Sequence, residues 1–250
     1  MYRFFVLPGN IDEAAGEIRI CGEDVSHIKN VLRMRPGENV ILCTGHEDDP
    51  VDYICRIESF PEGQVLTRII EKKASQAELP SKLYLFQGLP KADKLESVIQ
   101  KSVELGVYEI IPTVMQRSVV KLDDRKGARK AERWNAISQS AAKQSKRGII
   151  PHVEKPLSFK ESLAYAGRLD HVLVPYEDAR GMAHTREVLR SVQKGESAGI
   201  FIGPEGGFSD SEIEDLQKIG AEIITLGHRI LRTETAGIAV LSMLMMNLEN

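Results

Sequence analysis

A short glycine-rich segment near the C-terminus has the composition of a ligand-binding turn. It reads Gly-Pro-Glu-Gly-Gly over residues 203–207 and directly follows the apolar run 199–202. Glycine has no Cβ, so such a backbone can approach a flat ligand closely, while Glu205 can orient an amine or hold a neighbouring arginine. The segment is not a P-loop, because no Lys-Ser or Lys-Thr follows, and the G-x-G-x-x-G spacing is missing. The pattern alone is equally compatible with a tight turn between a strand and a helix.

The residues after the glycines predict where the next helix begins. Ser209 and Glu212 stand three positions apart, as the N-cap and the third helical residue do in a capping box. The expected order is therefore strand, glycine-rich turn and helix, with the helix over residues 210–219.

A second segment, residues 226–236, combines charged, hydroxyl and apolar side chains before the last helical stretch. Thr233 or Thr235 can cap that helix, whose N-terminal amides favour anions. An Ile-Leu pair can form a wall for a flat ring such as adenine, with Arg232 and Glu234 facing the ligand. Taken alone, the segment is better explained as an ordinary capped loop with a surface ion pair.

The charges are distributed unevenly along the chain. The net charge is −3, yet residues 117–147 contain ten Lys or Arg against three Asp or Glu. This stretch therefore carries +7 and the remainder carries −10. A positive segment on an acidic chain fits a polyanion that docks at one face, and a solvated helix face explains it equally well.

The first seventy residues alternate short apolar runs with turns, which predicts strands. Close spacing of such strands indicates a small β-barrel. The polar segment 71–80 ends in proline and is the expected linker, so we expect a barrel domain over residues 1–72 and a second domain over 73–250. Strands are expected over 3–7, 17–20, 39–43, 51–60 and 64–70, with one short helix near 27–34.

From residue 82 onward, apolar strands alternate with helices. This alternation predicts an α/β domain whose mostly parallel sheet is covered on both faces. Ligands of such sheets bind beyond the carboxyl ends of the strands, which is where both loops described above begin. Strands are expected over 83–86, 109–111, 171–174, 199–202 and 222–226, and helices over 91–105, 129–143, 185–194, 210–219 and 235–248.

The final helix is apolar around most of its circumference. Ile238, Leu241, Met245 and Leu248 form one stripe, and other apolar residues lie beside it. A helix of this kind must be covered on most sides. Burial within the domain and a subunit interface explain the pattern equally well.

Several classes of protein are disfavoured by composition. Three cysteines without a C-x-x-C pair argue against a disulfide framework and favour a reducing cytosol. The N-terminus leaves no room for the apolar core of a signal peptide, and no apolar run approaches the roughly 20 residues that span a bilayer. We therefore expect a cytoplasmic protein with no membrane partner. The histidines show no ligand spacing, so no metal site is expected.

Together, the two loops closely resemble those of the RsmE family of SPOUT methyltransferases. The resemblance rests on Ile-Gly-Pro-Glu-Gly-Gly-Phe-Ser over residues 202–209 and on Leu-Gly-x-Arg-Ile-Leu-Arg-x-Glu-Thr-Ala over 226–236. Upstream it continues through 94–106, 111–112, 132–134 and 141–147, and at the N-terminus through 3–5 and 27–33. The matching segments span nearly the whole chain in the family's order.

The resemblance implies an α/β trefoil-knot (SPOUT) methyltransferase domain preceded by a small PUA-like β-barrel that binds RNA. It implies S-adenosyl-L-methionine (SAM) as cofactor, a homodimer with the active site near its interface, and the small ribosomal subunit as partner. The implied reaction is methylation of N3 of a uridine in the decoding region of 16S rRNA. A knotted methyltransferase that modifies another RNA or a ribose, and a catalytically silent RNA-binding protein, stay open as alternatives.

The resemblance also indicates where the cofactor and the reacting base bind. We expect Arg232 to stabilise negative charge on the uracil, and Glu205 or Glu234 to orient groups or accept the N3 proton. The residues expected to bind the cofactor are Val174, Pro175, Ile202, Gly203, Pro204, Glu205, Gly206, Leu226, Gly227, Ile230, Leu231, Arg232, Thr235 and Ala236.

Basic residues of the N-terminal domain and of the positive stretch are the expected RNA contacts, because phosphates are bound by such side chains. For any one of them taken singly, solvated surface charge is the better explanation. The expected contacts are Arg3, His27, Arg33, Arg117, Arg133, Lys143 and Arg147.

Overall fold

The chain folds into two compact units in the computed structural model, which describes residues 1–45, 50–120, 124–177 and 181–249. Unit 1 contains Met1–Glu78 and Ala142–Ile150, and unit 2 contains Leu79–Ala141 and Pro151–Asn250. The return of residues 142–150 to unit 1 has no counterpart in the sequence pattern. The domain boundary between residues 72 and 73 stays a prediction.

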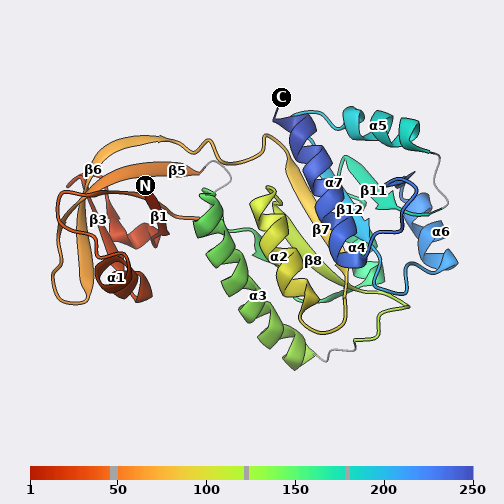
Figure 1. Cartoon of the computed structure of the whole chain (residues 1–250), viewed down its shortest axis with the longest axis horizontal. Coiled ribbons are helices and arrows are strands. Elements are labelled where there is room, and N and C mark those ends of the chain that lie inside the picture. Colours follow the sequence, from red (N-terminus) through yellow and green to blue (C-terminus); the bar gives the residue numbers. More distant parts are fainter. Residues whose placement is uncertain (46–49, 121–123, 178–180, 250) are drawn as a thin grey trace. The chain divides into compact units, whose positions relative to one another are not determined.

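Unit 1 is built on a six-stranded sheet in the order β1-β4-β5-β6-β3-β2. β1 pairs with β4 in parallel, and the other neighbours are antiparallel. Two register shifts between β5 and β6 add curvature, and the long curved strands are visible in Figure 1. Within the described residues no pairing joins β1 to β2, so the expected barrel is a curled, open sheet. The strands are β1 (Tyr2–Phe5), β2 (Ile11–Asp12), β3 (Glu17–Cys21), β4 (Asn39–Cys43), β5 (Val51–Ser59) and β6 (Gln64–Ala74).

The first part of the predicted linker is a strand. Residues 71–74 continue β6 and pair with β5, with Lys73 opposite Asp52 and Lys72 opposite Tyr53. Their side chains are exposed, so their polarity is that of a solvent-facing strand. A polar strand and a polar linker have the same composition, and for this reason the prediction was wrong there. The short helix expected near residues 27–34 is α1 (Glu23–Ser26) followed by a π-helical turn, His27–Val31.

Buried ion pairs fix two arginines inside unit 1. Arg3 donates two hydrogen bonds of 2.6 Å to the carboxylate of Asp52, and both side chains are more than nine-tenths buried. The guanidinium of Arg147, 4% exposed, pairs with Glu78, whose carboxylate also accepts from the backbone amide of Gly148 at 2.8 Å. Such geometry satisfies charges that burial would otherwise strongly disfavour.

Unit 2 contains a parallel sheet in the order β10-β8-β7-β12-β11-β13, with β9 paired to β8. Every pairing in this sheet is parallel, which confirms the predicted α/β class. The trefoil knot that the resemblance implies stays a prediction. The strands are β7 (Lys82–Gly88), β8 (Glu109–Val114), β9 (His152–Val153), β10 (Leu157–Ser158), β11 (His171–Pro175), β12 (Ser197–Ile202) and β13 (Glu222–Ile224).

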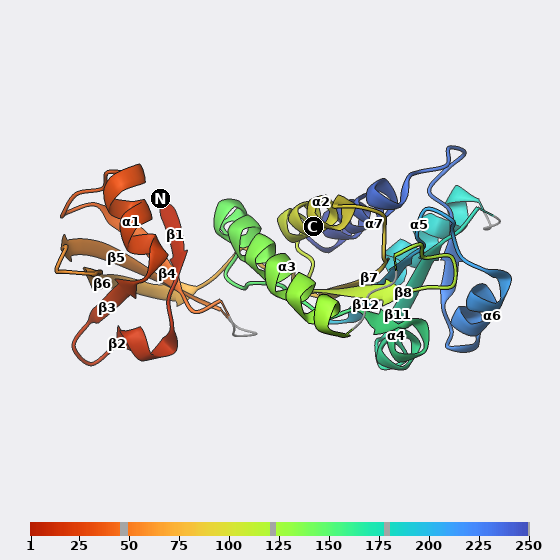
Figure 2. The same ribbon diagram turned by 90° about the horizontal axis from the view of Figure 1, so that it is seen from below.

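Helices cover both faces of this sheet. Figure 2 shows α2 and α7 on one side of the strands and α4 and α6 on the other. Alternate residues of β7 serve the two faces: Tyr84 and Phe86 pack in the aromatic core beneath α4 and α6, while Leu85 lies beneath α7. The helices are α2 (Lys94–Glu104), α3 (Asp124–Ser145), α4 (Phe159–Ala166), α5 (Met182–Ser191), α6 (Asp210–Lys218) and α7 (Thr233–Leu248).

Hydrophobic periodicity did not predict α4, because this helix has only 8 residues. α4 has a capping box in which the Ser158 hydroxyl accepts from the amide of Glu161, and the Glu161 carboxylate accepts from the amide of Ser158. The same signal correctly predicted the start of α6 at Ser209 and Glu212. Applied to residues 158–161, it would have located α4.

The final helix is covered mainly by its own unit. α7 packs on α2, β7 and β12, and it buries Val240, Leu241, Leu244 and Leu248. Met246 is 65% exposed, so the apolar surface of this helix is not fully covered within the chain. No helix in the described part of the chain has the length and apolar character needed to cross a membrane.

The Arg3–Asp52 pair gives a prediction about the stability of unit 1. Asp52→Ala leaves a buried guanidinium without its carboxylate and should lower the free energy of unfolding by about 3–5 kcal/mol. Hydrogen exchange of unit 1 amides in increasing urea would measure the change. In the control, Arg3→Met with Asp52→Leu removes both charges and should stay near the wild-type value. An equal loss in the control would mean that packing, not the unpaired charge, causes the effect.

Candidate cofactor site and active site

The two loops singled out in the sequence line one cavity at the carboxyl edge of the parallel sheet. The cavity has a volume of about 960 Å³ and lies within unit 2. It forms because β12 and β11 are neighbours and β11 also pairs with β13, so the segments that follow these strands emerge side by side. The predicted site residues that line it are Pro175, Ile202, Gly203, Pro204, Glu205, Gly206, Leu226, Gly227, Ile230, Leu231, Arg232, Glu234 and Ala236.

Two predicted cofactor residues do not line the cavity. Val174 is fully buried in the aromatic core beneath α4 and α6. Successive residues of a strand point to opposite faces of the sheet, so Val174 points away from the face on which Pro175 lies. Thr235 is exposed and lies on α7 outside the cavity lining. Cavity residues that the sequence did not single out as cofactor ligands include Lys94, Tyr176, Met182, Phe208 and Thr233.

The glycine-rich loop passes unusually close to neighbouring backbone. A Cβ on Gly88, at the end of β7, would lie 2.6 Å from the amide nitrogen of Pro204. A Cβ on Gly203 would lie 3.1 Å from the carbonyl carbon of Gly207, across the turn itself. Gly207 has a φ of +68°, which L side chains rarely adopt. The compact path of this loop therefore depends on glycine at several points.

Lys94, the first residue of α2, joins the two loops by its charge. Its Nζ lies 3.0 Å from Oε1 of Glu205 and 3.4 Å from Oε2 of Glu234. The backbone amide of Lys91 also donates to Glu205, at 3.1 Å. One ammonium thus bridges both carboxylates that the sequence singled out. Nothing in the local sequence around Lys94 indicates this role, since Glu205 lies 111 residues away.

The environment of Glu205 favours its charged form. Partial burial opposes ionisation, but the hydrogen bonds from Lys94 and from backbone amides outweigh it and lower the pKa of Glu205 below its ordinary value. The hydrogen bond to Glu205 correspondingly raises the pKa of Lys94. Glu205 is therefore held as a carboxylate beside a fixed cation.

The second loop is anchored at both ends. At its start, the Thr185 hydroxyl on α5 donates to the carbonyl of Thr225 and accepts from the Thr225 amide. At its end, Thr233 is buried, and its hydroxyl donates to the carbonyl of Gly203 at 2.6 Å. The residue at the N-cap position of α7 is Arg232, so the expectation that Thr233 or Thr235 caps this helix was wrong. The Thr233 hydroxyl is engaged with the glycine-rich loop instead.

The middle of the second loop is open to solvent. Ile230 is 89% exposed, so in this structure it is not part of a buried apolar wall. Leu231 is half-buried, and Arg232 is exposed at the cavity. Gly227 has a φ of +102°, which L side chains rarely adopt, although no atom lies within 4 Å of where a Cβ would stand. Glycine is therefore required here by the backbone turn and not by lack of space.

Among the predicted RNA contacts, Arg117 belongs to the cavity. Its Nη1 donates to the carbonyl of Gly206 at 3.0 Å, and its side chain fills the space that a Cβ on Gly206 would enter. The adjacent amide of Gln116 donates to the buried carboxylate of Glu212 at 2.7 Å. The capping box of α6 therefore also holds the segment that carries Arg117.

The remaining predicted RNA contacts differ in exposure. Arg3 and Arg147 are buried in the ion pairs described above, so the structure argues against both as phosphate ligands. Lys143 is paired with Asp24 at 2.8 Å, and Arg133 is 65% exposed and paired with Glu96. His27 and Arg33 are exposed in unit 1. Lys121 of the positive stretch and His46 lie outside the described residues.

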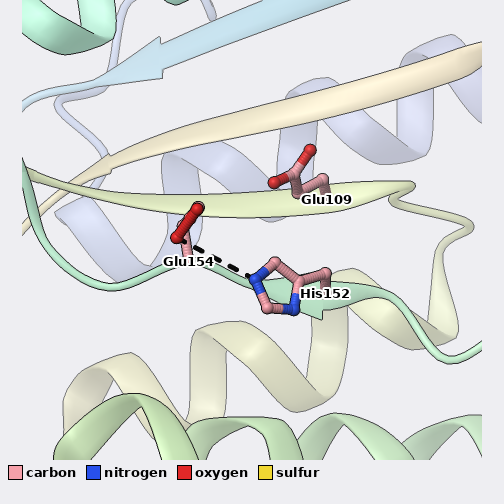
Figure 3. A group of neighbouring side chains, drawn as sticks. All are labelled: Glu109, His152 and Glu154. Atoms are coloured by element: carbon pink, nitrogen blue, oxygen red, sulfur yellow. Dashed lines mark ion pairs between the residues drawn. The ribbon is translucent and has the colours of Figure 1, made fainter. Parts of the chain in front are cut away.

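A separate polar cluster lies on β8 and β9 (Figure 3). Glu109 and His152 are register partners, and Glu154 follows on the same strand path, so their ligand-type atoms fall within 4.8 Å of one another. Sequence spacing did not indicate this group. Burial raises the pKa of Glu109, although the Tyr165 hydroxyl donates to it at 2.7 Å. His152 lies 3.9 Å from Glu154, while the hydrogen-bond partner of Glu109 is Tyr165.

Family models match both parts of the chain. An RNA methyltransferase domain matches residues 77–245, and an RNA methyltransferase PUA domain matches residues 20–70. The matched ranges correspond to the parallel-sheet fold and to most of the curled sheet, and they confirm the PUA-like and methyltransferase fold classes expected from the resemblance.

Individual relatives extend over nearly the full length. The chain is 40% identical to the ribosomal RNA small subunit methyltransferase E of Bacillus subtilis over 246 residues, which are 97% of this chain and 95% of that protein. A putative methyltransferase from Legionella pneumophila, solved with bound SAM, is 34% identical with a TM-score of 0.77, covering 91% of this chain and 90% of its own.

A third relative is the ribosomal RNA small subunit methyltransferase E of Neisseria gonorrhoeae, solved with bound S-adenosyl methionine. It is 29% identical with a TM-score of 0.80, and the likeness covers 97% of this chain and 95% of that one. The family models, the sequence relatives and the solved structures indicate the same family. The chain belongs to the RsmE family of small-subunit ribosomal RNA methyltransferases.

Proposed function

We propose that this protein transfers a methyl group from SAM to N3 of a uridine in the decoding region of 16S rRNA. The observation that carries the proposal is the cavity in which the glycine-rich loop, the second loop and three charged side chains meet. Full-length relatives named as small-subunit ribosomal RNA methyltransferases support the substrate class, and two SAM-bound relatives support the cofactor.

The residues of the cavity fit SAM. Its volume of about 960 Å³ lies at the upper end of the range for small-molecule sites. Glycines at 203, 206 and 227 leave backbone accessible, and Leu226 and Leu231 supply apolar surface for an adenine ring. When bound, SAM supplies a methyl group that is electrophilic because it is carried on a sulfonium cation.

The charged residues divide the remaining work. N3 of uracil becomes nucleophilic when its proton leaves, and the exposed guanidinium of Arg232 is placed to stabilise the resulting negative charge. Glu205, held ionised by Lys94, is suited to orienting groups rather than to taking a proton. We assign proton acceptance to Glu234, which lines the same cavity and lies 3.4 Å from Lys94, whereas Glu205 is engaged by Lys94 at 3.0 Å.

The exposed face of α3 fits an RNA backbone. Arg125, Arg129 and Arg133 stand four residues apart and are all exposed in unit 2. Their Cα atoms therefore rise by about 6 Å from one to the next along one face of the helix. Like charges at this spacing disfavour the helix by themselves, and phosphates would relieve that repulsion. We assign this stripe as the phosphate-binding surface of unit 2 in place of the buried Arg3 and Arg147. His27 and Arg33 are separate candidates on unit 1.

The assembly and cellular location follow from the same proposal. We assign the small ribosomal subunit as the partner and the cytoplasm as the location, since ribosomal subunits are assembled there. A homodimer would cover the part of α7 that includes the exposed Met246. The domains would comprise residues 1–72 for RNA binding and 73–250 for catalysis.

The reaction itself is tested by methyl transfer from labelled SAM to small ribosomal subunits from cells that lack this gene. Mass spectrometry of the digested RNA should show 3-methyluridine, because N3 is the atom that the proposal places against the methyl group. Label on a ribose hydroxyl would indicate a different knotted methyltransferase. SAM binding without any transfer would identify a silent RNA-binding protein.

The charged residues of the cavity can be separated by kinetics. Arg232→Ala should lower kcat by about 100-fold with smaller effects on the KM for SAM, because the guanidinium acts on charge that develops during the reaction.

Lys94→Met removes the main cause that lowers the pKa of Glu205, so the acidic limb of the rate profile should move to higher pH. Lys101→Met, on the same helix and paired with Glu104, is the control. An unchanged pH profile in Lys94→Met would exclude a role for the Glu205 charge.

The α3 stripe is tested by the salt dependence of RNA binding. Replacing Arg125 and Arg129 by Gln should reduce the slope of log affinity against log salt by about 1.5, as expected for two lost phosphate contacts on single-stranded RNA. Arg186 and Arg190 have the same spacing and exposure on α5, so the same double change there is the control. Equal slopes in both variants would contradict the assignment.

A further inference from the structure

A chain of buried hydrogen bonds joins three elements beneath the cavity. The side-chain amide of Gln87, on β7, donates to the Thr233 hydroxyl at 2.8 Å and to the carbonyl of Gly88 at 3.1 Å. Thr233 in turn donates to the carbonyl of Gly203 at 2.6 Å. Gln87 is fully buried beneath the cavity, and Thr233 contributes to the cavity lining with only 7% of its surface exposed.

The direction of every bond in this chain is fixed by the number of protons. A threonine hydroxyl has one proton, and Thr233 gives it to Gly203, so it can only accept from Gln87. Gln87 uses both amide protons, and its Oε1 is left buried with no partner in the described residues. An unsatisfied buried carbonyl is unfavourable, so the arrangement is retained against a local cost. Turning the amide over would place Oε1 against the Gly88 carbonyl.

Close packing of backbone surrounds the chain. The end of β7 touches the Gly203–Pro204 peptide at Gly88, as described above. On α7, a Cβ on Gly237 would lie 3.3 Å from Leu85 and 3.6 Å from Oε1 of Gln87. The glycine-rich loop, β7 and α7 are therefore closely packed here, and at Gly88 there is no room for a Cβ.

The hydrogen-bonded chain lies next to the residues assigned to catalysis. Glu205 follows Gly203 by two positions, while Arg232 and Glu234 flank Thr233 directly. The Lys94 bridge joins the same two segments at the cavity surface. A shift of the Gly203 carbonyl away from Thr233 would change the distance between the glycine-rich loop and the second loop.

We propose that Gln87 and Thr233 are positioning residues that fix the glycine-rich loop relative to the second loop. This inference rests on the proposed function for its effect on SAM, but its effect on the loops does not. Neither side chain need touch the methyl group or the base. Their contribution is the fixed position of the Gly203 carbonyl relative to the start of α7.

The test compares Thr233→Val, which has nearly the same shape without the hydroxyl, with Thr233→Ser, which keeps it. Thr233→Val should increase amide hydrogen exchange in residues 203–208 and weaken SAM binding by about tenfold, because a buried carbonyl loses its donor. Thr233→Ser should restore both. Calorimetry gives the affinity for SAM, and mass spectrometry gives the exchange. Gln87→Met should act in the same direction, and combining it with Thr233→Val should add little.

Thr113→Val is the matched control. Thr113 is equally buried in unit 2, and its hydroxyl contacts the Ile111 carbonyl and Ser162 away from the cavity. The Thr113→Val variant should lose global stability without a change in the hydrogen exchange of residues 203–208 or in the affinity for SAM. The inference is overturned if Thr233→Val leaves both unchanged, if Thr233→Ser fails to restore them, or if Thr113→Val reproduces them. Absence of SAM binding in the wild-type protein would refute the proposed cofactor, and the exchange comparison would still decide the role of Thr233.

Discussion

Two loops that leave different strands form one site only if their separation is fixed. In this protein the constraint is buried: Gln87 donates to Thr233, and Thr233 donates to the carbonyl of Gly203. Backbone hydrogen bonds within the sheet position β12 and β13 but end before the loops begin. Beyond that point, the hydrogen bonds from Gln87 to Thr233 and from Thr233 to Gly203 connect the loops to the sheet. The Lys94 bridge between Glu205 and Glu234 depends on this connection, since an ion pair at a partly exposed site contributes too little to fix two loops by itself.

The distribution of arginines shows how the same residue type serves opposite purposes. Arg3 and Arg147 are buried within unit 1, and each pairs with one carboxylate, so neither guanidinium is open to a phosphate. Arg117 fixes the glycine-rich loop through the Gly206 carbonyl. Arg125, Arg129 and Arg133 are exposed on α3, where a charged ligand can reach them. Net charge along the chain does not distinguish these cases, because burial and the nearest carboxylate decide what each guanidinium can bind.

The sequence was sufficient to predict much of the fold. Apolar runs predicted the longer strands of both sheets, with β4 found at its predicted bounds, because burial requires apolar side chains at regular spacing. They did not predict the two-residue strands β2, β9 and β10, which are too short to show a pattern. Capping boxes mark the starts of α4 and α6, since the hydrogen bonds involved are local. The polar end of β6 was mistaken for linker, because an exposed strand and a linker share one composition.

For the site, the sequence by itself determined the chemistry of the two loops: the glycines, Glu205, Arg232 and Glu234 are adjacent in the chain and form recognisable patterns. Only the tertiary structure decided which residues complete it. The completing residues are Lys94 on α2, Gln87 on β7 and Arg117 after β8. Their partners in the loops lie 111, 146 and 89 residues away along the chain. Sequence spacing has no information about such contacts, because they are set by strand order and by how closely α7 approaches the sheet.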